Sequence, residues 1–168
     1  MMNIIVITGA PGVGKTTVLP AICERLPQKN GFIDGDSVGR TKPLDIELER
    51  LNLIQDNIYA CAQNFQKWGA EWFVAGFVLP TQEKIQRLTD ALKKLDCRVH
   101  IIGLVADKET LSKRNKEKNE SYGRDPGSIL GAIELDEMIK EIKGIHIIDT
   151  TALSLIQVAD KVVDYCGI

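Results

Sequence analysis

The sequence lacks the features that mark several large classes of protein. It has no marked excess of charge, because 21 Lys and Arg residues nearly balance 23 Asp and Glu residues and leave a net charge of -2. A nearly neutral chain has no general attraction to nucleic acid or to an anionic membrane. Neither is therefore an expected partner, and any anion that the protein binds must be held by a local site.

Zinc ligands and disulfide frameworks are also missing. The chain has only two His and four Cys residues, and no two Cys residues form a C-x-x-C pair. No apolar run is long enough to span a bilayer, and the first one lacks the preceding basic segment of a signal peptide. We therefore expect a cytoplasmic protein with reduced, mostly buried thiols. These thiols are Cys23, Cys61, Cys97 and Cys166.

What the sequence does contain is an alternation of short β-branched runs and longer stretches of helical periodicity. This alternation is typical of a parallel sheet with helices on both faces. A chain of 168 residues is long enough for one such domain, spanning 1–168. The expected strands are 3–8, 31–34, 71–78, 98–105 and 145–148, and the expected helices are 15–26, 45–67, 81–95, 108–118, 128–143 and 155–165. The polar stretch 116–128 is rich in turn formers and predicts a mobile surface flap.

The first expected strand runs directly into a glycine-rich segment that fits the P-loop pattern G-x-x-x-x-G-K-[ST]. Its glycines leave backbone amides free to surround a phosphate, and the following helix adds its positive dipole end. Lys15 is expected to reach the β- and γ-phosphates, and the Thr16 hydroxyl to ligate Mg²⁺. The expected nucleotide-binding residues are Gly9, Gly12, Val13, Gly14, Lys15, Thr16 and Thr17.

A second polar segment, Asp34-Gly35-Asp36, follows the second expected strand. Because the carboxyl ends of neighbouring parallel strands share one crevice, both carboxylates are expected beside the γ-phosphate. One could accept the proton of an attacking hydroxyl while the other helps to hold Mg²⁺, and Arg40 could pair with an anionic group of the acceptor. We expect Asp36 on the metal side and Asp34, with Arg40, on the substrate side, although which carboxylate is the base stays open.

These segments together resemble the small P-loop metabolite kinases, which include gluconate, shikimate and adenylylsulfate kinases, chloramphenicol phosphotransferase and the nucleoside monophosphate kinases. GAPGVGKTT and IDGDSVGR carry the resemblance, and FVAGFVLPTQEKIQRL, VHIIGLVADKETLSKRNKEK and IIDTTALSLIQVADKVV continue it in the same order. The resemblance implies an α/β, three-layer P-loop NTPase fold with a five-stranded parallel sheet. It also implies Mg-ATP as the phosphoryl donor and a small hydroxyl-bearing metabolite as the acceptor.

The resemblance also assigns roles to parts of the chain. It implies that Lys15, Asp34 and Asp36 act in catalysis, and that Arg114 or Arg124 closes over the phosphates from a lid at about 115–128. Residues 40–68 would form a helical region that covers the acceptor. The chain departs from the family in two places: Ala75-Gly76-Phe77-Val78 offers no acidic residue at the end of the third strand, and Ser37-Val38-Gly39 replaces the His-Pro pair of gluconate kinases.

Other functions remain as alternatives at this stage. A GTPase requires N-K-x-D after a strand, whereas Ala106-Asp107-Lys108-Glu109 occupies that place. A nucleoside monophosphate-type kinase is an alternative on the same fold. A non-catalytic ATP-binding regulatory module is an alternative from another class. The acceptor, the nucleotide preference and the oligomeric state stay open.

Overall fold

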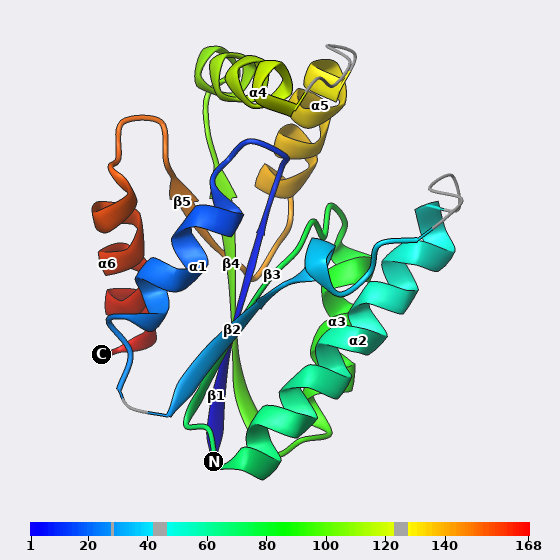
Figure 1. The fold of residues 1–168 in the computed structure, drawn as a ribbon, viewed down its shortest axis with the longest axis vertical. Coiled ribbons are helices and arrows are strands. Elements are labelled where there is room, and N and C mark those ends of the chain that lie inside the picture. Colours follow the sequence, from blue (N-terminus) through cyan, green and yellow to red (C-terminus); the bar gives the residue numbers. More distant parts are fainter. Residues whose placement is uncertain (28, 42–46, 123–127) are drawn as a thin grey trace.

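The protein, described here from a computed structural model that covers residues 1–27, 29–41, 47–122 and 128–168, is built on one parallel sheet (Figure 1). The strand order is β2-β3-β1-β4-β5, so β1 lies at the centre and pairs with both β3 and β4. The strands are β1 (Met2–Gly9), β2 (Asn30–Asp34), β3 (Trp72–Gly76), β4 (Cys97–Val105) and β5 (His146–Asp149).

The described residues also form six α-helices and one short 3-10 helix. The 3-10 helix η1 (Gly35–Ser37) follows β2 directly. The α-helices are α1 (Lys15–Cys23), α2 (Glu47–Trp68), α3 (Gln82–Lys93), α4 (Lys108–Tyr122), α5 (Ser128–Lys140) and α6 (Leu155–Cys166).

Helices cover both faces of the sheet and complete three layers (Figure 1). One core contains the inward residues of α1 and α6, such as Leu19 and Val162, and the other contains those of α2, α3 and α5, such as Ile54, Leu88 and Ile139. A central strand that is covered on both faces must be apolar throughout. The IIVI run of β1 meets this requirement, because none of its four side chains is exposed. The predicted α/β fold class, a P-loop NTPase fold with a five-stranded parallel sheet, is confirmed.

Most element boundaries lie within two or three residues of those predicted. β3 ends at Gly76, two residues earlier than predicted, and Leu79 beyond it exchanges hydrogen bonds with the Thr8 side chain. The prediction of an irregular segment from Lys116 onward was wrong as far as Tyr122, since α4 continues to that residue. Lys and Glu are good helix formers, and they dominate this part of the chain. Residues 123–127 lie outside the described ranges.

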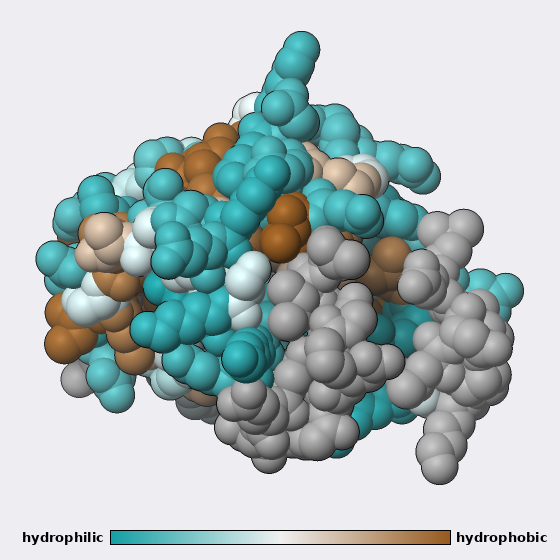
Figure 2. Space-filling view, turned by 90° about the horizontal axis from the view of Figure 1, so that it is seen from above, coloured by the Kyte–Doolittle hydropathy of each residue, from teal (hydrophilic) through white to brown (hydrophobic). Residues whose placement is uncertain are grey.

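All strands run in one direction, so their carboxyl ends gather at one end of the molecule. Figure 2 looks onto that end and shows a mostly hydrophilic surface with scattered apolar residues. Among the described residues, no helix has the length and apolar character that crossing a bilayer requires. The four cysteines are free thiols.

Candidate functional site

The P-loop lies between the end of β1 and the start of α1, where the sequence predicted it. Gly12 and Gly14 have φ angles of 84° and 108°, which is the left-handed region that side chains rarely adopt. Gly9 is required for a different reason, because a Cβ there would lie 2.8 Å from the Leu104 carbonyl oxygen. The three glycines therefore allow a backbone path that other residues would block.

Lys15 and the two threonines begin α1 at the mouth of this loop. The Lys15 ammonium donates to the carbonyl oxygens of Gly9 and Ala10, at 2.8 and 3.0 Å. The Thr17 hydroxyl donates to the Gly14 carbonyl at 2.8 Å. The first turn of α1 thus brings a cation and the N-terminal amides of a helix to one point, which is the arrangement that binds anions at helix N-termini.

The end of β2 brings Asp34 against the P-loop. The Thr16 hydroxyl donates to Asp34 Oδ2 at 2.6 Å, and the Asp36 backbone N–H donates to Asp34 Oδ1 at 3.0 Å. Asp34 is half-buried, and both of its carboxylate oxygens are engaged. Of the two predicted carboxylates, Asp34 is therefore the one in contact with the P-loop.

Asp36 points to a different neighbour, Arg50 of α2. Their side chains form an ion pair of 3.2 Å, and the Arg50 guanidinium also donates to the Gly39 carbonyl at 3.1 Å. The Asp36 side chain is 63% exposed and so remains open to solvent. Arg40, which the sequence suggested as the cation near these carboxylates, is exposed and has no hydrogen bond or ion pair with any part of the chain that the structure describes.

Helix α4 reaches the P-loop from the opposite side. Arg114 donates to the Val13 carbonyl at 3.4 Å and to the Thr150 hydroxyl and carbonyl, each at 3.1 Å. Asn115, which is 3% exposed, donates to the Pro11 carbonyl at 2.9 Å. Of the two predicted lid arginines, Arg114 therefore contacts the P-loop backbone, whereas Arg124 lies outside the described residues.

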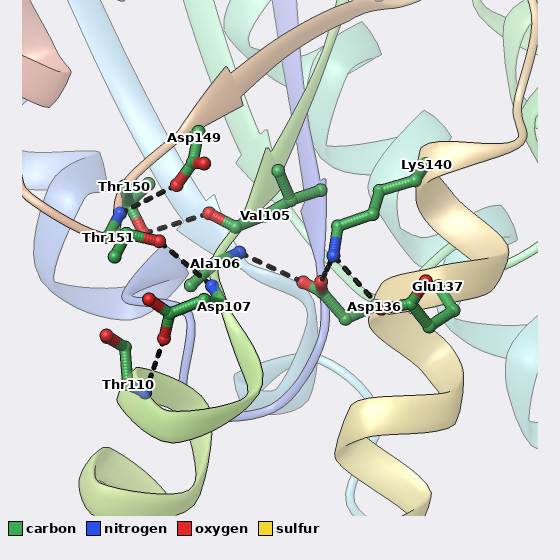
Figure 3. A network of polar contacts seen from close by, with 10 residues as sticks. All are labelled: Val105, Ala106, Asp107, Thr110, Asp136, Glu137, Lys140, Asp149, Thr150 and Thr151. Carbon is green, nitrogen blue, oxygen red and sulfur yellow. Dashed lines mark hydrogen bonds and ion pairs between the residues drawn. The ribbon is translucent and has the colours of Figure 1, made fainter.

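A polar network holds the base of α4 in place (Figure 3). The Thr150 N–H donates to the Val105 carbonyl at 2.8 Å, and the Ala106 N–H donates to Asp136 Oδ1 at 3.2 Å. Asp136 is almost fully buried, and the Lys140 ammonium lies 2.8 Å from its other oxygen. This ion pair raises the pKa of Lys140 and, with the bond from Ala106, ties α5 to the end of β4.

Two further carboxylates lie at the same strand ends. The Thr110 N–H donates to Asp107 Oδ1 at 2.7 Å and lowers the pKa of Asp107, so Asp107 caps the start of α4. Hydrogen bonds from Thr151 lower the pKa of Asp149 in the same way. Both groups are therefore ionised at neutral pH and fix the backbone turns that follow β4 and β5.

Sequence reasoning missed Arg50 and Asn115. Arg50 shares one face of α2 with Ile54 and Asn57, and this face covers the segment after Asp36. The helical spacing of these residues was visible in the sequence, but the segment that they contact was not. Asn115 carried no sequence signal, because its partner Pro11 is 104 residues away.

Comparisons with known proteins agree with this architecture. One similar solved structure is a gluconokinase from Sinorhizobium meliloti 1021, with 17% identity, a TM-score of 0.71, and coverage of 98% of this chain and 91% of that chain. An APS kinase from Mycobacterium tuberculosis, in complex with AMPPNP and APS, has 15% identity, a TM-score of 0.71, and coverage of 99% and 98%. A shikimate kinase from Acinetobacter baumannii, in complex with shikimate, has 20% identity, a TM-score of 0.64, and coverage of 99% and 94%.

At these identities the likeness shows a shared fold, which is the P-loop NTPase fold. No curated protein matches the chain significantly in sequence. Residues 4–145, which include the P-loop, both carboxylates of the D-G-D segment and helix α4, match the AAA domain family. The chain belongs to the AAA domain family.

Proposed function

We propose that this protein is an ATP-dependent phosphotransferase that moves the γ-phosphate of Mg-ATP to a small hydroxyl-bearing metabolite. The observation that carries the proposal is the contact of 2.6 Å between Thr16 of the P-loop and Asp34 at the end of β2. It joins a phosphate cradle to a carboxylate at the carboxyl edge of a parallel sheet, where ligands of such folds bind.

The proposed donor side consists of the P-loop and Asp34. Backbone amides and Lys15 would hold the phosphates of ATP, and Lys15 would leave the loop carbonyls that it now contacts. The Thr16 hydroxyl and the Asp34 carboxylate fit Mg²⁺, because both are hard oxygen donors and lie side by side. When bound, Mg²⁺ would neutralise the negative charge of the nucleotide phosphates.

The proposed acceptor side consists of Asp36 and Arg50. The sequence suggested Asp36 for the metal and Asp34 for the substrate, but their contacts favour the reverse assignment. Asp34 is occupied by Thr16, whereas Asp36 is exposed and held by one guanidinium. We therefore assign to Asp36 the removal of the proton from the acceptor hydroxyl, and to Arg50 the orientation of that carboxylate.

The lid remains part of the proposal. Arg114 is bonded to Val13 and Thr150, so it would have to exchange these partners in order to reach the transferred phosphate. Arg124 stays a prediction from the sequence. The family resemblance favours a hydroxyl-bearing acceptor of the gluconate or shikimate kinase type, and α2 would cover it from the side of Arg50.

The test is ADP release from Mg-ATP across a panel of sugar acids, shikimate, nucleosides, nucleoside monophosphates and aminoglycoside-like alcohols. One acceptor should raise ADP release well above the background hydrolysis. With that acceptor, Asp36→Asn should lower kcat by about 100-fold or more, since general base catalysis contributes about 10²–10⁴-fold. Asp34→Asn should lower transfer as strongly and should also raise the Mg²⁺ concentration that half-maximal transfer requires.

The control is Asp90→Asn, an exposed substitution on α3 outside the proposed site. It should transfer phosphate at the rate of the unchanged protein. Full activity of both Asp34→Asn and Asp36→Asn would refute the proposed mechanism. Tight ATP binding without turnover on any acceptor would instead favour a regulatory nucleotide-binding module.

A further inference from the structure

Asn115 makes the most direct side-chain contact between α4 and the P-loop backbone. Its side-chain Nδ2 donates to the Pro11 carbonyl and to the Leu111 carbonyl, both at 2.9 Å, so both of its N–H groups are used. The side chain also lies against Gly12, because a Cβ on Gly12 would be 2.3 Å from Nδ2. The contact is therefore close, buried and compatible only with glycine at position 12.

The contact fixes the direction of a backbone amide. The carbonyl of Pro11 and the N–H of Gly12 belong to one planar trans peptide unit and point in opposite directions. When Asn115 holds this carbonyl toward α4, the Gly12 N–H must point away from α4 and across the loop. Arg114 acts in the same way on the Val13–Gly14 peptide, because it contacts the Val13 carbonyl and so directs the N–H of Gly14.

The two glycine amides have no acceptor in the described ranges of the chain. By contrast, the Val13 N–H is bonded to the Ala10 carbonyl at 3.3 Å, and the Val18 N–H is bonded to the Gly14 carbonyl at 3.0 Å. Backbone donors that are oriented alike but left unpaired form an anion-binding concavity. The P-loop therefore has two backbone N–H donors without an acceptor among the described residues, and side chains of α4 hold these two donors in position.

We propose that Asn115 is a positioning residue that keeps the Gly12 N–H aimed at the β-phosphate of the bound nucleotide. This role rests on the proposed function only in so far as the P-loop binds a nucleotide, and it does not require phosphoryl transfer. Asn115 does not touch the nucleotide itself. It acts through the Pro11–Gly12 peptide, and so it should affect the β-phosphate more than the nucleoside and the α-phosphate.

The experiment measures the affinities of ADP and AMP by calorimetry, without any acceptor. Asn115→Leu keeps the size of the side chain and removes both donors. It should weaken ADP binding by about tenfold to hundredfold, because a hydrogen bond to a charged group contributes about 1.5–3 kcal/mol. The affinity for AMP should change by less than about threefold, because AMP has no β-phosphate for the Gly12 N–H to contact.

Asn30→Leu is the matched control. Asn30 also donates from its side-chain amide to two backbone carbonyls, those of Leu26 and Pro27, but at the amino end of β2. This variant should lose stability to a similar degree and keep the affinities for both nucleotides. A purely structural role for Asn115 predicts that the two variants behave alike, and that outcome would overturn the proposal.

A second measurement needs no variant. In the unchanged protein, saturation with ADP should move the Gly12 amide proton downfield in an NMR spectrum, whereas AMP should move it much less. An unchanged Gly12 resonance with ADP bound, or equal losses of ADP and AMP affinity in Asn115→Leu, would refute the assignment. A protein that binds ADP as expected but transfers phosphate to nothing would count against the kinase function and not against Asn115.

Discussion

His100 is the residue whose protonation the fold opposes most clearly. Its imidazole stacks on Trp72 with ring centroids 6.0 Å apart, and its Nε2 is buried without a hydrogen-bond partner among the described residues. Burial, together with the nearby charge of Arg98, lowers the pKa of His100. The folded protein therefore prefers the neutral imidazole.

This shift predicts that stability falls in mild acid. In the unfolded chain His100 has its ordinary pKa of about 6.5, whereas in the folded protein this pKa is lower. As the pH falls through this range, the unfolded state therefore binds more protons than the folded state. The urea midpoint should decrease as the pH is lowered from about 7.5 to about 5.5. His100→Gln should flatten this dependence. An unchanged slope in His100→Gln would contradict the prediction.

At the scale of the element, α6 shows how local sequence defines a helix start. Ser154 accepts from the Gln157 N–H at 3.3 Å, and the Gln157 side chain accepts from the Ser154 N–H at 2.9 Å, which completes a capping box. Because α6 packs against α1, this cap also stabilises the layer behind the P-loop.

Ser154→Ala should therefore lower the free energy of unfolding by about 0.5–2 kcal/mol, the usual value of an N-cap. Ser112→Ala, in the interior of α4, is the control and should change the free energy of unfolding by less than about 0.5 kcal/mol. Chemical denaturation of the two variants compares them directly. Equal stability of Ser154→Ala and the unchanged protein would show that the capping box adds nothing here.

At the scale of the whole molecule, two hydrophobic cores share one sheet. Leu19 of α1 belongs to one core and Leu88 of α3 to the other, and neither side chain is exposed. The same five strands form the opposite wall of both cores. Loss of either core should therefore unfold the sheet on which the other depends.

Leu19→Ala and Leu88→Ala should each lower the free energy of unfolding by about 2–5 kcal/mol. Each variant should show one transition, with coincident curves from far-UV circular dichroism and from tryptophan fluorescence. Leu53→Ala, at a side chain that is 44% exposed, should have a much smaller effect. Separate transitions for the two probes would contradict a shared sheet.

The sequence by itself determined the fold class and the P-loop, because both depend on local patterns. The glycine spacing before Lys15 and the alternation of strand and helix periodicity are read within a few residues, and the structure has the corresponding elements in order. Helix α4 was underestimated because its charged end was interpreted as irregular, although Lys and Glu favour helix.

Only the tertiary structure decided which side chains meet across the site. Thr16 contacts Asp34, Asp36 pairs with Arg50 in place of Arg40, and Asn115 holds the peptide that precedes Gly12. Helical periodicity indicates which face of α2 or α4 is buried, but it does not indicate which distant segment that face will cover. That choice depends on how each helix packs over the sheet, since packing brings together residues that are far apart in the sequence.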